Sequence, residues 1–499
     1  MKPIILAVTV ALLAAAAPAA AKKPTPKPLE LTPIGRTAPL GEAQAEIAAF
    51  HARSKRVFAT NAAANRLDIY NFANPAAPTL LESVDLAPFG GGPNSVAVTK
   101  KGIVAVAVEA DPKTDPGSVQ FFGVNGDHLC GVTAGALPDM LTFTEDERTL
   151  LVANEGEPSD DGLTDPEGSV SVLDLKRGHC NARVRTAGLA NTPLLNGPRI
   201  VTAGNTPQKD FEPEYIATEG GLAWITIQEA NAIGLLDIER ARFLYVRGLG
   251  YKDHGLPANA LDPNDQNGPL LGTFPGVRGM YQPDAIAAYR SRHGIQFVTA
   301  NEGDARDNDV TAEESRVSGL DLDETAFPAG PGALARLTVT TTQGDTDGDG
   351  DYDELYAFGG RSMSILDAFG RVRSDTGDEL ERFTLATDPL SFNADHSLVA
   401  AVDNRSDNKG PEPEAVTVGE VGGTTYAFLG AERQGGVFAY DLDADPGEAS
   451  LAGYVNTRPL DRGPEGALFI AKGDSPNRKP LLLMTNEITG TISVYELRR

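Results

Sequence analysis

Residues 212–248 read EPEYIATEGGLAWITIQEANAIGLLDIERARFLYVRG, and this stretch contains one complete copy of a repeating pattern. The first segment opens at a Pro–acid pair with Glu214, and the second, WITIQE, ends at Glu229. Two further apolar segments follow, AIGLLDI and RFLYVRG, with short turns between them. Alternating β-branched and aromatic residues bounded by turn residues indicate strands. The stretch therefore predicts four short antiparallel β-strands.

The same pattern occurs seven times along the chain. A first strand opens next to an acid or amide, at Glu46, Asn94, Asp139, Glu214, Asp284, Glu414 and Glu465. A second strand ends in Asn or an acid, at Asn61, Glu109, Glu155, Glu229, Glu302, Glu432 and Glu487. Seven units of four short strands are typical of a β-propeller. We therefore predict an all-β fold, a single seven-bladed β-propeller domain over residues 29–499.

The two ends of this region are complementary. The last unit stops at its third strand, TISVYELRR, and a spare strand, LELTPIGRT, precedes the first unit. We expect the N-terminal strand to complete the seventh blade, because closing the ring removes an exposed sheet edge.

The N-terminus has the features of a secretory signal peptide. Lys2 precedes an apolar run from Ile4 to Ala17, and small residues follow up to Ala21. We assign residues 1–21 to a signal peptide and residues 22–28 to a Pro-rich lead-in. No later segment has the ~20 apolar residues that cross a bilayer. The sequence therefore predicts a soluble periplasmic or secreted protein with no transmembrane segment.

The net charge argues against one class of binding partner. The formal net charge is −26, and no basic stripe with interleaved aromatics occurs, which argues against nucleic-acid binding.

The only cysteines are Cys130 and Cys180. Export permits a disulfide between them, and two separate buried thiols are the alternative.

The segment ANEG occurs twice, at residues 153–156 and 300–303. In an antiparallel pair the start of one strand lies beside the end of the next, so the acids at strand starts and ends should share one face. The long connections 154–168, 188–213, 248–283, 303–355 and 388–413 should emerge there too. The candidate ligand-binding residues are Glu155, Glu157, Glu214, Glu229, Asp284, Asn301, Glu302, Asp304, Arg306, Arg361, Arg405, Glu412, Glu414, Glu432, Glu465, Asn486 and Glu487.

Such crowded carboxylates cannot all stay ionised without cations or protons to offset them. We therefore expect this acidic face to bind a cation or a polar ligand. The alternative is that the acids cap strand ends and pair with Arg306, Arg361, Arg405 and Arg433.

A second acidic feature is DTDGDGDYDE, residues 345–354. Alternate carboxylates followed by a glycine suit a hard cation, and form half of a calcium-binding loop. The twelfth loop position is Tyr356 rather than Glu, so this is not an EF-hand. We predict calcium or a similar divalent cation here, and a solvated acidic turn is the alternative. The candidate ligands are Asp345, Asp347, Asp349, Asp351 and Asp353.

The sequence lacks the common catalytic signatures. The six histidines are scattered, and H-E-x-x-H, G-x-S-x-G, the P-loop and the dinucleotide fingerprint do not occur. An enzyme built on this sequence would rely on carboxylates and bound metal.

Several segments together resemble the choice-of-anchor I domain family. They are ANEGEPSDD…DPEGSVSVLDL, EPEYIA…ITIQEANAIGLLDI, YKDHGLPANALDPNDQNG, YQPDAIA…TANEGDARD, AFGGRSMSILD and NRSDNKGPEPEAV, in order along the chain. This family is similar to mesenchyme-specific cell-surface glycoproteins. The resemblance implies an exported propeller-type domain, often held at the surface by varied C-terminal anchors. Some relatives are described as alkaline phosphatase-like or phytase-like. The chain ends at VYELRR with no sorting motif or hydrophobic tail, and in this it departs from the anchored pattern of the family.

Two functions follow from these observations. The first is a non-enzymatic propeller that binds a ligand, a surface or a partner protein through an acidic, calcium-dependent face. The second is a metal-dependent phosphoric monoester hydrolase, in which clustered carboxylates hold cations and Arg306 or Arg405 clamps the phosphate. We favour the first, because no catalytic signature is complete.

Overall fold

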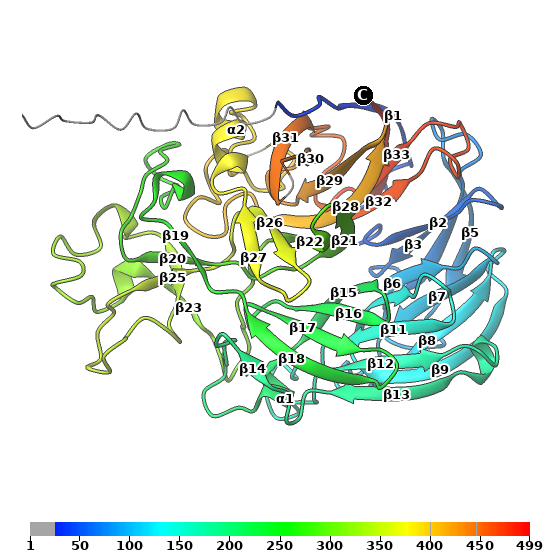
Figure 1. Ribbon diagram of the computed structural model, residues 1–499, viewed down its shortest axis with the longest axis horizontal. Coiled ribbons are helices and arrows are strands. Elements are labelled where there is room, and N and C mark those ends of the chain that lie inside the picture. The colour runs from blue at the N-terminus through cyan, green and yellow to red at the C-terminus, as the bar shows by residue number, and fades with distance from the viewer. Residues whose placement is uncertain (1–24, 400, 446) are drawn as a thin grey trace, which may run out of the picture.

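The computed structural model describes residues 25–399, 401–445 and 447–499. The predicted signal peptide and the first part of the lead-in lie outside the described residues. The described chain is nearly all-β, as predicted, and forms eight β-sheets of four or five strands (Figure 1). Its helices and 3-10 turns are short: α1 (Pro207–Asp210), α2 (Glu379–Thr387), η1 (His179–Asn181), η2 (Pro257–Asn259), η3 (Val317–Gly319) and η4 (Gly332–Leu334).

Seven of these sheets repeat one antiparallel order. Their first strands are β2 (Ala48–His51), β6 (Pro93–Val98), β10 (Pro138–Phe143), β15 (Pro213–Glu219), β21 (Ile286–Ser291), β28 (Pro413–Val421) and β32 (Pro464–Ile470). Their second strands are β3 (Arg56–Asn61), β7 (Ile103–Val108), β11 (Thr149–Asn154), β16 (Leu222–Ile227), β22 (Gly294–Asn301), β29 (Thr424–Ala431) and β33 (Leu481–Asn486). Their third strands are β4 (Arg66–Asn71), β8 (Pro116–Gly123), β12 (Ser169–Asp174), β17 (Ala232–Asp237), β26 (Ser362–Asp367), β30 (Val437–Asp445) and β34 (Thr491–Arg498). Their fourth strands are β5 (Thr79–Asp85), β9 (His128–Ala136), β13 (Arg183–Gly188), β18 (Arg242–Gly248), β27 (Val372–Asp375), β31 (Glu448–Val455) and β1 (Glu30–Arg36).

The fourth strand beside β34 comes from the other end of the chain. β1 pairs with β34 in antiparallel register, with Glu30 opposite Arg498 and Arg36 opposite Ser493. The first strands contact one another in chain order from β2 to β32, and β32 contacts β2. Figure 1 shows the sheets arranged around a common centre, as in a β-propeller.

The hydrophobic core lies between consecutive sheets. Phe58 from β3 packs with Val106 and Phe122 of the next sheet, and the rings of Trp224 and Phe297 lie 4.4 Å apart across another interface. A further cluster joins Val57 of β3 to Leu483 of β33. Each fully buried side chain of this size stabilises the fold by roughly 1.5–3 kcal/mol. The alternating apolar residues therefore hold neighbouring sheets face to face.

The strand starts that carry the acids are irregular. The register shifts at the beginning of β6, β10, β15, β28 and β32, directly after the proline that opens each strand. Proline cannot donate a ladder hydrogen bond, and a bulge redirects the side chain beside it. The acid or amide that follows the proline is thus released from regular pairing. These residues are Asn94, Asp139, Glu214, Glu414 and Glu465.

The eighth sheet is made from two of the predicted long connections. β19 (Tyr251–Asp253), β20 (Val277–Met280), β25 (Leu355–Ala357), β24 (Thr338–Thr340) and β23 (Glu314–Arg316) lie in that order. It has its own core, which includes Leu261, Leu337 and Val339. The sequence pattern does not indicate this sheet, because its strands are very short and β20 pairs in parallel with the distant β25.

Two smaller features complete the fold. β14 (Leu194–Leu195) adds a parallel strand to β18. A disulfide joins Cys130 in β9 to Cys180 in η1, with an S–S distance of 2.03 Å. It ties the edge of one sheet to the turn that leads into the fourth strand of the next.

Candidate functional site

A cavity of about 290 Å³ lies where the first strands begin, and all seven repeated sheets contribute to it. We call it the central acidic cavity. Its polar lining residues include Glu46, Asn94, Asp139, Glu155, Glu214, Tyr215, Gln228, Asp284, Glu302, Glu414 and Glu465. The seven residues that open the predicted repeat units are all present. No lysine or arginine is among the described residues that line it.

The predicted binding set anticipates most of this lining and misses some of it. Glu155, Glu214, Asp284, Glu302, Glu414 and Glu465 are brought together as expected. Glu46, Asn94 and Asp139 also line the cavity but are absent from the predicted set, although the repeat pattern that opens each unit marks them. Tyr215 carries no such signal in the sequence.

Crowding makes these carboxyl groups hard to ionise. Burial, followed by the charges of Glu487 and Asp139, raises the pKa of Glu46 to about 8. Burial and Glu109 raise the pKa of Asp139 to about 7. Burial raises the pKa of Glu302 to about 7, although Lys409 opposes the shift. The cavity as a whole therefore favours added positive charge.

The strongest pKa shifts fall on five other carboxyl groups that line this cavity. Burial, and then a neighbouring carboxylate, raises the pKa well above its usual range for each of them. They are Glu155, Glu214, Asp284, Glu414 and Glu465. In the described residues, Glu214 Oε2 and Glu414 Oε2 are buried and have no hydrogen-bond partner. Buried oxygens of this kind are costly unless a cation or proton satisfies them.

The Asn, Glu and Gly of the repeated ANEG segment each have a different structural role. Asn154 donates to the hydroxyls of Ser169 and Ser171 (3.2 and 3.0 Å), and Asn301 donates to Ser362 and Ser364 (3.2 and 2.8 Å). Each Asn thus ties the end of a second strand to the third strand beside it. The following Glu lines the central acidic cavity.

The glycine of this segment is required by geometry. Gly156 and Gly303 have φ angles of 70° and 93°. A Cβ on Gly303 would lie 2.2 Å from the nitrogen of Gly359, and one on Gly156 would lie 2.8 Å from the carbonyl carbon of Glu167. Only glycine fits so close an approach without strain.

Three predicted residues lie elsewhere. Asn486 is buried and donates to the Ser493 hydroxyl (3.1 Å). Arg361 is buried, pairs with Glu381 at 3.0 Å and donates to the carbonyl oxygens of Ser406 and Asn408. Glu487 does not line the cavity, but its charge contributes to the raised pKa of Glu46.

A cluster of paired charges borders the cavity at Glu302. Lys409 Nζ lies 3.0 Å from Glu302 Oε1 and 3.5 Å from Glu412 Oε2. Arg405 pairs with Glu412 at 2.6 Å, and Arg433 Nε contacts both Glu412 (3.2 Å) and Glu432 (3.0 Å). These acids therefore follow the alternative in which carboxylates pair with basic residues.

A second cavity of about 360 Å³ opens beside the first, and we call it the side pocket. Its residues are Glu157, Pro158, Glu212, Glu229, Asp304, Ala305, Arg306, Asp307, Asn308 and Glu314. Four of them belong to the predicted set: Glu157, Glu229, Asp304 and Arg306. Arg306 is buried and pairs with Glu212 at 2.8 Å and with Asp210 at 3.6 Å. Its guanidinium is therefore committed to neighbouring acids.

The predicted calcium loop is compact. Asp345, Asp347 and Asp353 bring one carboxylate oxygen each within 4.8 Å of one another. Asp351 and Asp353 do the same with Asp323. Burial and the neighbouring Asp349 raise the pKa of Asp351 to about 6.

The carboxylates that converge at this loop differ from the predicted ligand set at two residues. Asp349 belongs to neither group of converging carboxylates, whereas Asp323 joins one of them. Asp323 is distant in the sequence from the D-x-D-x-D run, so only the fold brings it near. The Asp345 carboxylate also accepts the N–H groups of Gly348 and Gly350, at 2.6 and 3.1 Å.

Residues 46–445 match the family model of the choice-of-anchor I domain. The chain belongs to this family. Among characterised relatives, this choice-of-anchor I protein is 30% identical to Gigasin-3a from Magallana gigas over 186 residues, which are 33% of this chain and 65% of that protein. The match thus spans less than two thirds of the relative's length.

The solved structures to which the chain is similar share little sequence with it. Hydrazine synthase from Kuenenia stuttgartiensis is 12% identical, with a TM-score of 0.48 over 91% of this chain and 96% of that chain. The β-propeller domain of Cps50 (Swd1) from Myceliophteria thermophila is 8% identical, with a TM-score of 0.47 over 94% and 99%. Within the described residues, no helix is long and apolar enough to cross a membrane.

Proposed function

We propose that this choice-of-anchor I protein is an exported, non-enzymatic β-propeller that binds a ligand through its acidic face, with calcium held in the central acidic cavity. The single observation that carries the proposal is the convergence of carboxylates from separate sheets on one cavity without a lysine or arginine in its lining. Such a cavity repels anions and stabilises cations. Its unpartnered oxygens at Glu214 and Glu414 are available as ligands, and Ca²⁺ prefers carboxylate oxygens.

The fold component of the proposal is that the seven repeated sheets are the blades of one closed ring. The pairing of β1 with β34 and the contact of β32 with β2 support it. The cluster that joins Val57 to Leu483 supports it from the core. A closed ring would hold the acids at a fixed separation that ionised groups would not adopt by themselves.

A separate calcium site at the 345–353 loop is the second component. The convergence of Asp345, Asp347 and Asp353 supports it, with Asp323 and Asp351 beside them. A cation there would offset the mutual repulsion of the loop carboxylates. This site would stabilise the loop next to the eighth sheet, whereas the central acidic cavity would serve ligand binding.

Export is the third component. The predicted signal peptide over residues 1–21 and the family membership support a protein that works outside the cytoplasm. Free Ca²⁺ is plentiful in extracellular settings, where modules bind it with Kd values on the order of 10⁻⁴–10⁻³ M.

Phosphoric monoester hydrolysis has less support. The two arginines expected to clamp phosphate, Arg306 and Arg405, are already paired with Glu212 and Glu412. A phosphate would have to compete with carboxylates 2.8 and 2.6 Å away. We therefore expect no hydrolysis of a chromogenic phosphate monoester by the calcium-loaded protein.

The test is calorimetric titration of the chelator-treated mature chain with CaCl₂. Replacing Glu414 and Glu465 by Gln keeps side-chain shape and removes two carboxyl groups that could ionise to bind Ca²⁺, so calcium affinity there should fall at least tenfold. Glu82→Gln, at an exposed position in β5, is the matched control. Asp347→Asn should remove only the loop component. Unchanged calcium binding by the double variant would refute a calcium site in the central acidic cavity.

A further inference from the structure

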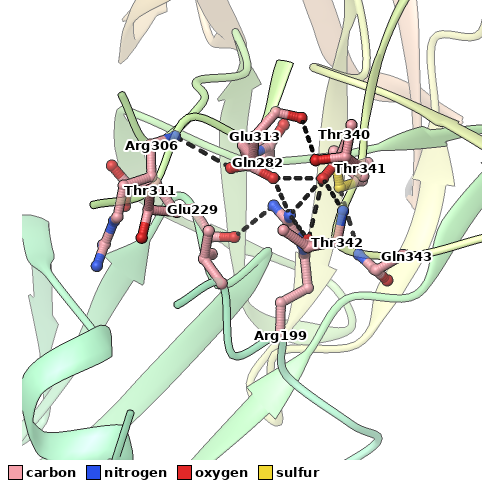
Figure 2. A network of polar contacts seen from close by, with 12 residues as sticks. Arg199, Glu229, Gln282, Arg306, Thr311, Glu313, Thr340, Thr341, Thr342 and Gln343 are labelled. Carbon is pink, nitrogen blue, oxygen red and sulfur yellow. Dashed lines mark hydrogen bonds and ion pairs between the residues drawn. The ribbon is translucent and has the colours of Figure 1, made fainter. Parts of the chain in front are cut away.

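The side pocket adjoins a buried cluster of ionic residues whose charges do not balance. Arg199, Asp210, Glu212, Glu229, Arg306 and Glu313 are each no more than 9% exposed. Figure 2 shows four of them, Arg199, Glu229, Arg306 and Glu313, gathered in one network. The cluster holds two arginines and four acids, and it ties the segment around α1 to the eighth sheet.

The two arginines contact three of the four acids, Asp210, Glu212 and Glu313. Arg199 pairs with Glu313 at 2.5 Å and donates to the main-chain oxygen of Glu229 at 2.9 Å. Glu313 also accepts the main-chain N–H of Arg306 at 3.0 Å. Arg306 pairs with Asp210, which in turn accepts the N–H groups of Val201 and Thr202.

With all four acids ionised, the cluster would carry a net charge of minus two. Glu212 uses one oxygen to contact Arg306 at 2.8 Å. Its other oxygen, Oε1, is buried without a partner, and so is Oε2 of Glu229. Glu212 is 3% exposed and Glu229 is 9% exposed, and both line the side pocket. Buried carboxylate oxygens without a partner are costly, so a positive ligand at this pocket would be stabilising.

We propose that the side pocket binds one hydrated divalent cation, of the size of Mg²⁺ or Mn²⁺, through Glu212 and Glu229. The site is distinct from the central acidic cavity and from the 345–353 loop. A charge of plus two matches the residual charge of the cluster. Glu157 and Asp304 stand at the same pocket and add negative potential, although Lys113 and Lys409 contact them at 2.7 and 3.2 Å.

Hydration of the ion follows from the spacing of the acids. Among the described residues, no group of three carboxylates of the side pocket converges within 4.8 Å. Protein oxygens alone therefore do not form a cage for Ca²⁺, which takes six to eight ligands, as a general rule. Mg²⁺ usually keeps several waters and binds through one or two carboxylates. A pocket of about 360 Å³ has room for such an ion with its water shell.

The ion would connect separate parts of the chain. Glu212 follows α1, Glu229 follows β16, and the pocket is closed by residues 304–308 of the long connection after β22. A cation held by the first two would fix the base of that connection against the propeller.

The first experiment is anomalous diffraction from crystals of the full mature protein soaked in MnCl₂. We expect a peak in the side pocket within about 2.5 Å of a carboxylate oxygen of Glu212 or Glu229, a normal metal–oxygen distance. Absence of a peak there at millimolar Mn²⁺ would overturn the proposal and leave protons as the partners of these oxygens.

The second experiment counts bound Mn²⁺ by electron paramagnetic resonance. Glu229→Gln should lose one ion per chain or weaken its binding at least tenfold, and it keeps the main-chain oxygen that accepts from Arg199. Glu212→Gln should do the same if the variant folds. Glu82→Gln, at an exposed position in β5, is the control and should retain the ion. Equal loss in Glu82→Gln, or no loss in Glu229→Gln, would contradict the assignment.

Discussion

Replacing Glu46 by Gln should make the protein more stable at alkaline pH. Glu46 has a pKa of about 8 in the folded protein, compared with a usual value of 4.5, because of burial and the nearby acids Glu487, Asp139 and Glu109. Between these values the folded protein keeps a proton that the unfolded chain has released. Stability therefore falls as pH rises through this window, and below pH 4.5 the penalty is absent.

The magnitude follows from the size of the shift. Between pH 5 and pH 8 the full shift would cost the wild type about 3.5 kcal/mol at this one residue. Glu46 is half-buried rather than fully buried, so we expect about 1–2 kcal/mol of this penalty to be realised. The Gln variant has no charge to bury and should avoid it. For a chain of this length, about 1 kcal/mol corresponds to roughly 1 °C in Tm.

The assay is differential scanning calorimetry in chelator at pH 5 and pH 8. The Tm of Glu46→Gln minus that of the wild type should rise by about 1–2 °C from the lower to the higher pH. Glu82→Gln, which changes an exposed acid of β5, should show no such rise. A Tm difference between variant and wild type that is the same at both pH values would refute the reasoning. It would mean that ionising Glu46 costs no free energy of folding. Adding calcium should reduce the effect if a cation occupies the cavity.

Three further predictions concern the stability of the fold. Arg361→Met should cost about 3–5 kcal/mol, because it leaves Glu381 buried and unpaired, and a denaturant titration would measure the loss. An unchanged midpoint would mean that Glu381 finds another partner. Deletion of residues 29–36 removes β1 and exposes the edge of β34, so light scattering should detect dimers or aggregates; a stable monomer would argue against closure by this strand. Reduction of the Cys130–Cys180 disulfide should lower stability by about 2–4 kcal/mol, and an unchanged Tm under reducing conditions would contradict a stabilising role.

The strands of the repeated sheets were accessible to sequence reasoning because their signals are local. Alternation in WITIQE or AIGLLDI depends only on which face of a strand each side chain occupies. The acid beside each opening proline is equally local, because proline forces an irregular strand start. The eighth sheet could not be anticipated in this way, since β20 and β25 pair in parallel across a long separation.

The candidate site also has a part that the sequence indicates and a part that only the fold determines. The repeat pattern alone indicated that the strand-start acids, from Glu46 to Glu465, and the second-strand acids Glu155 and Glu302 should meet on one face, because antiparallel pairing requires it. Only the tertiary structure decided which charges remain without a partner. Arg306 pairs with Asp210 and Glu212, which lie far from it along the chain, whereas Glu212 and Glu229 each keep one unpartnered oxygen. Strand periodicity is a property of neighbours in sequence, but the balance of buried charge depends on every group that the fold brings within a few ångströms.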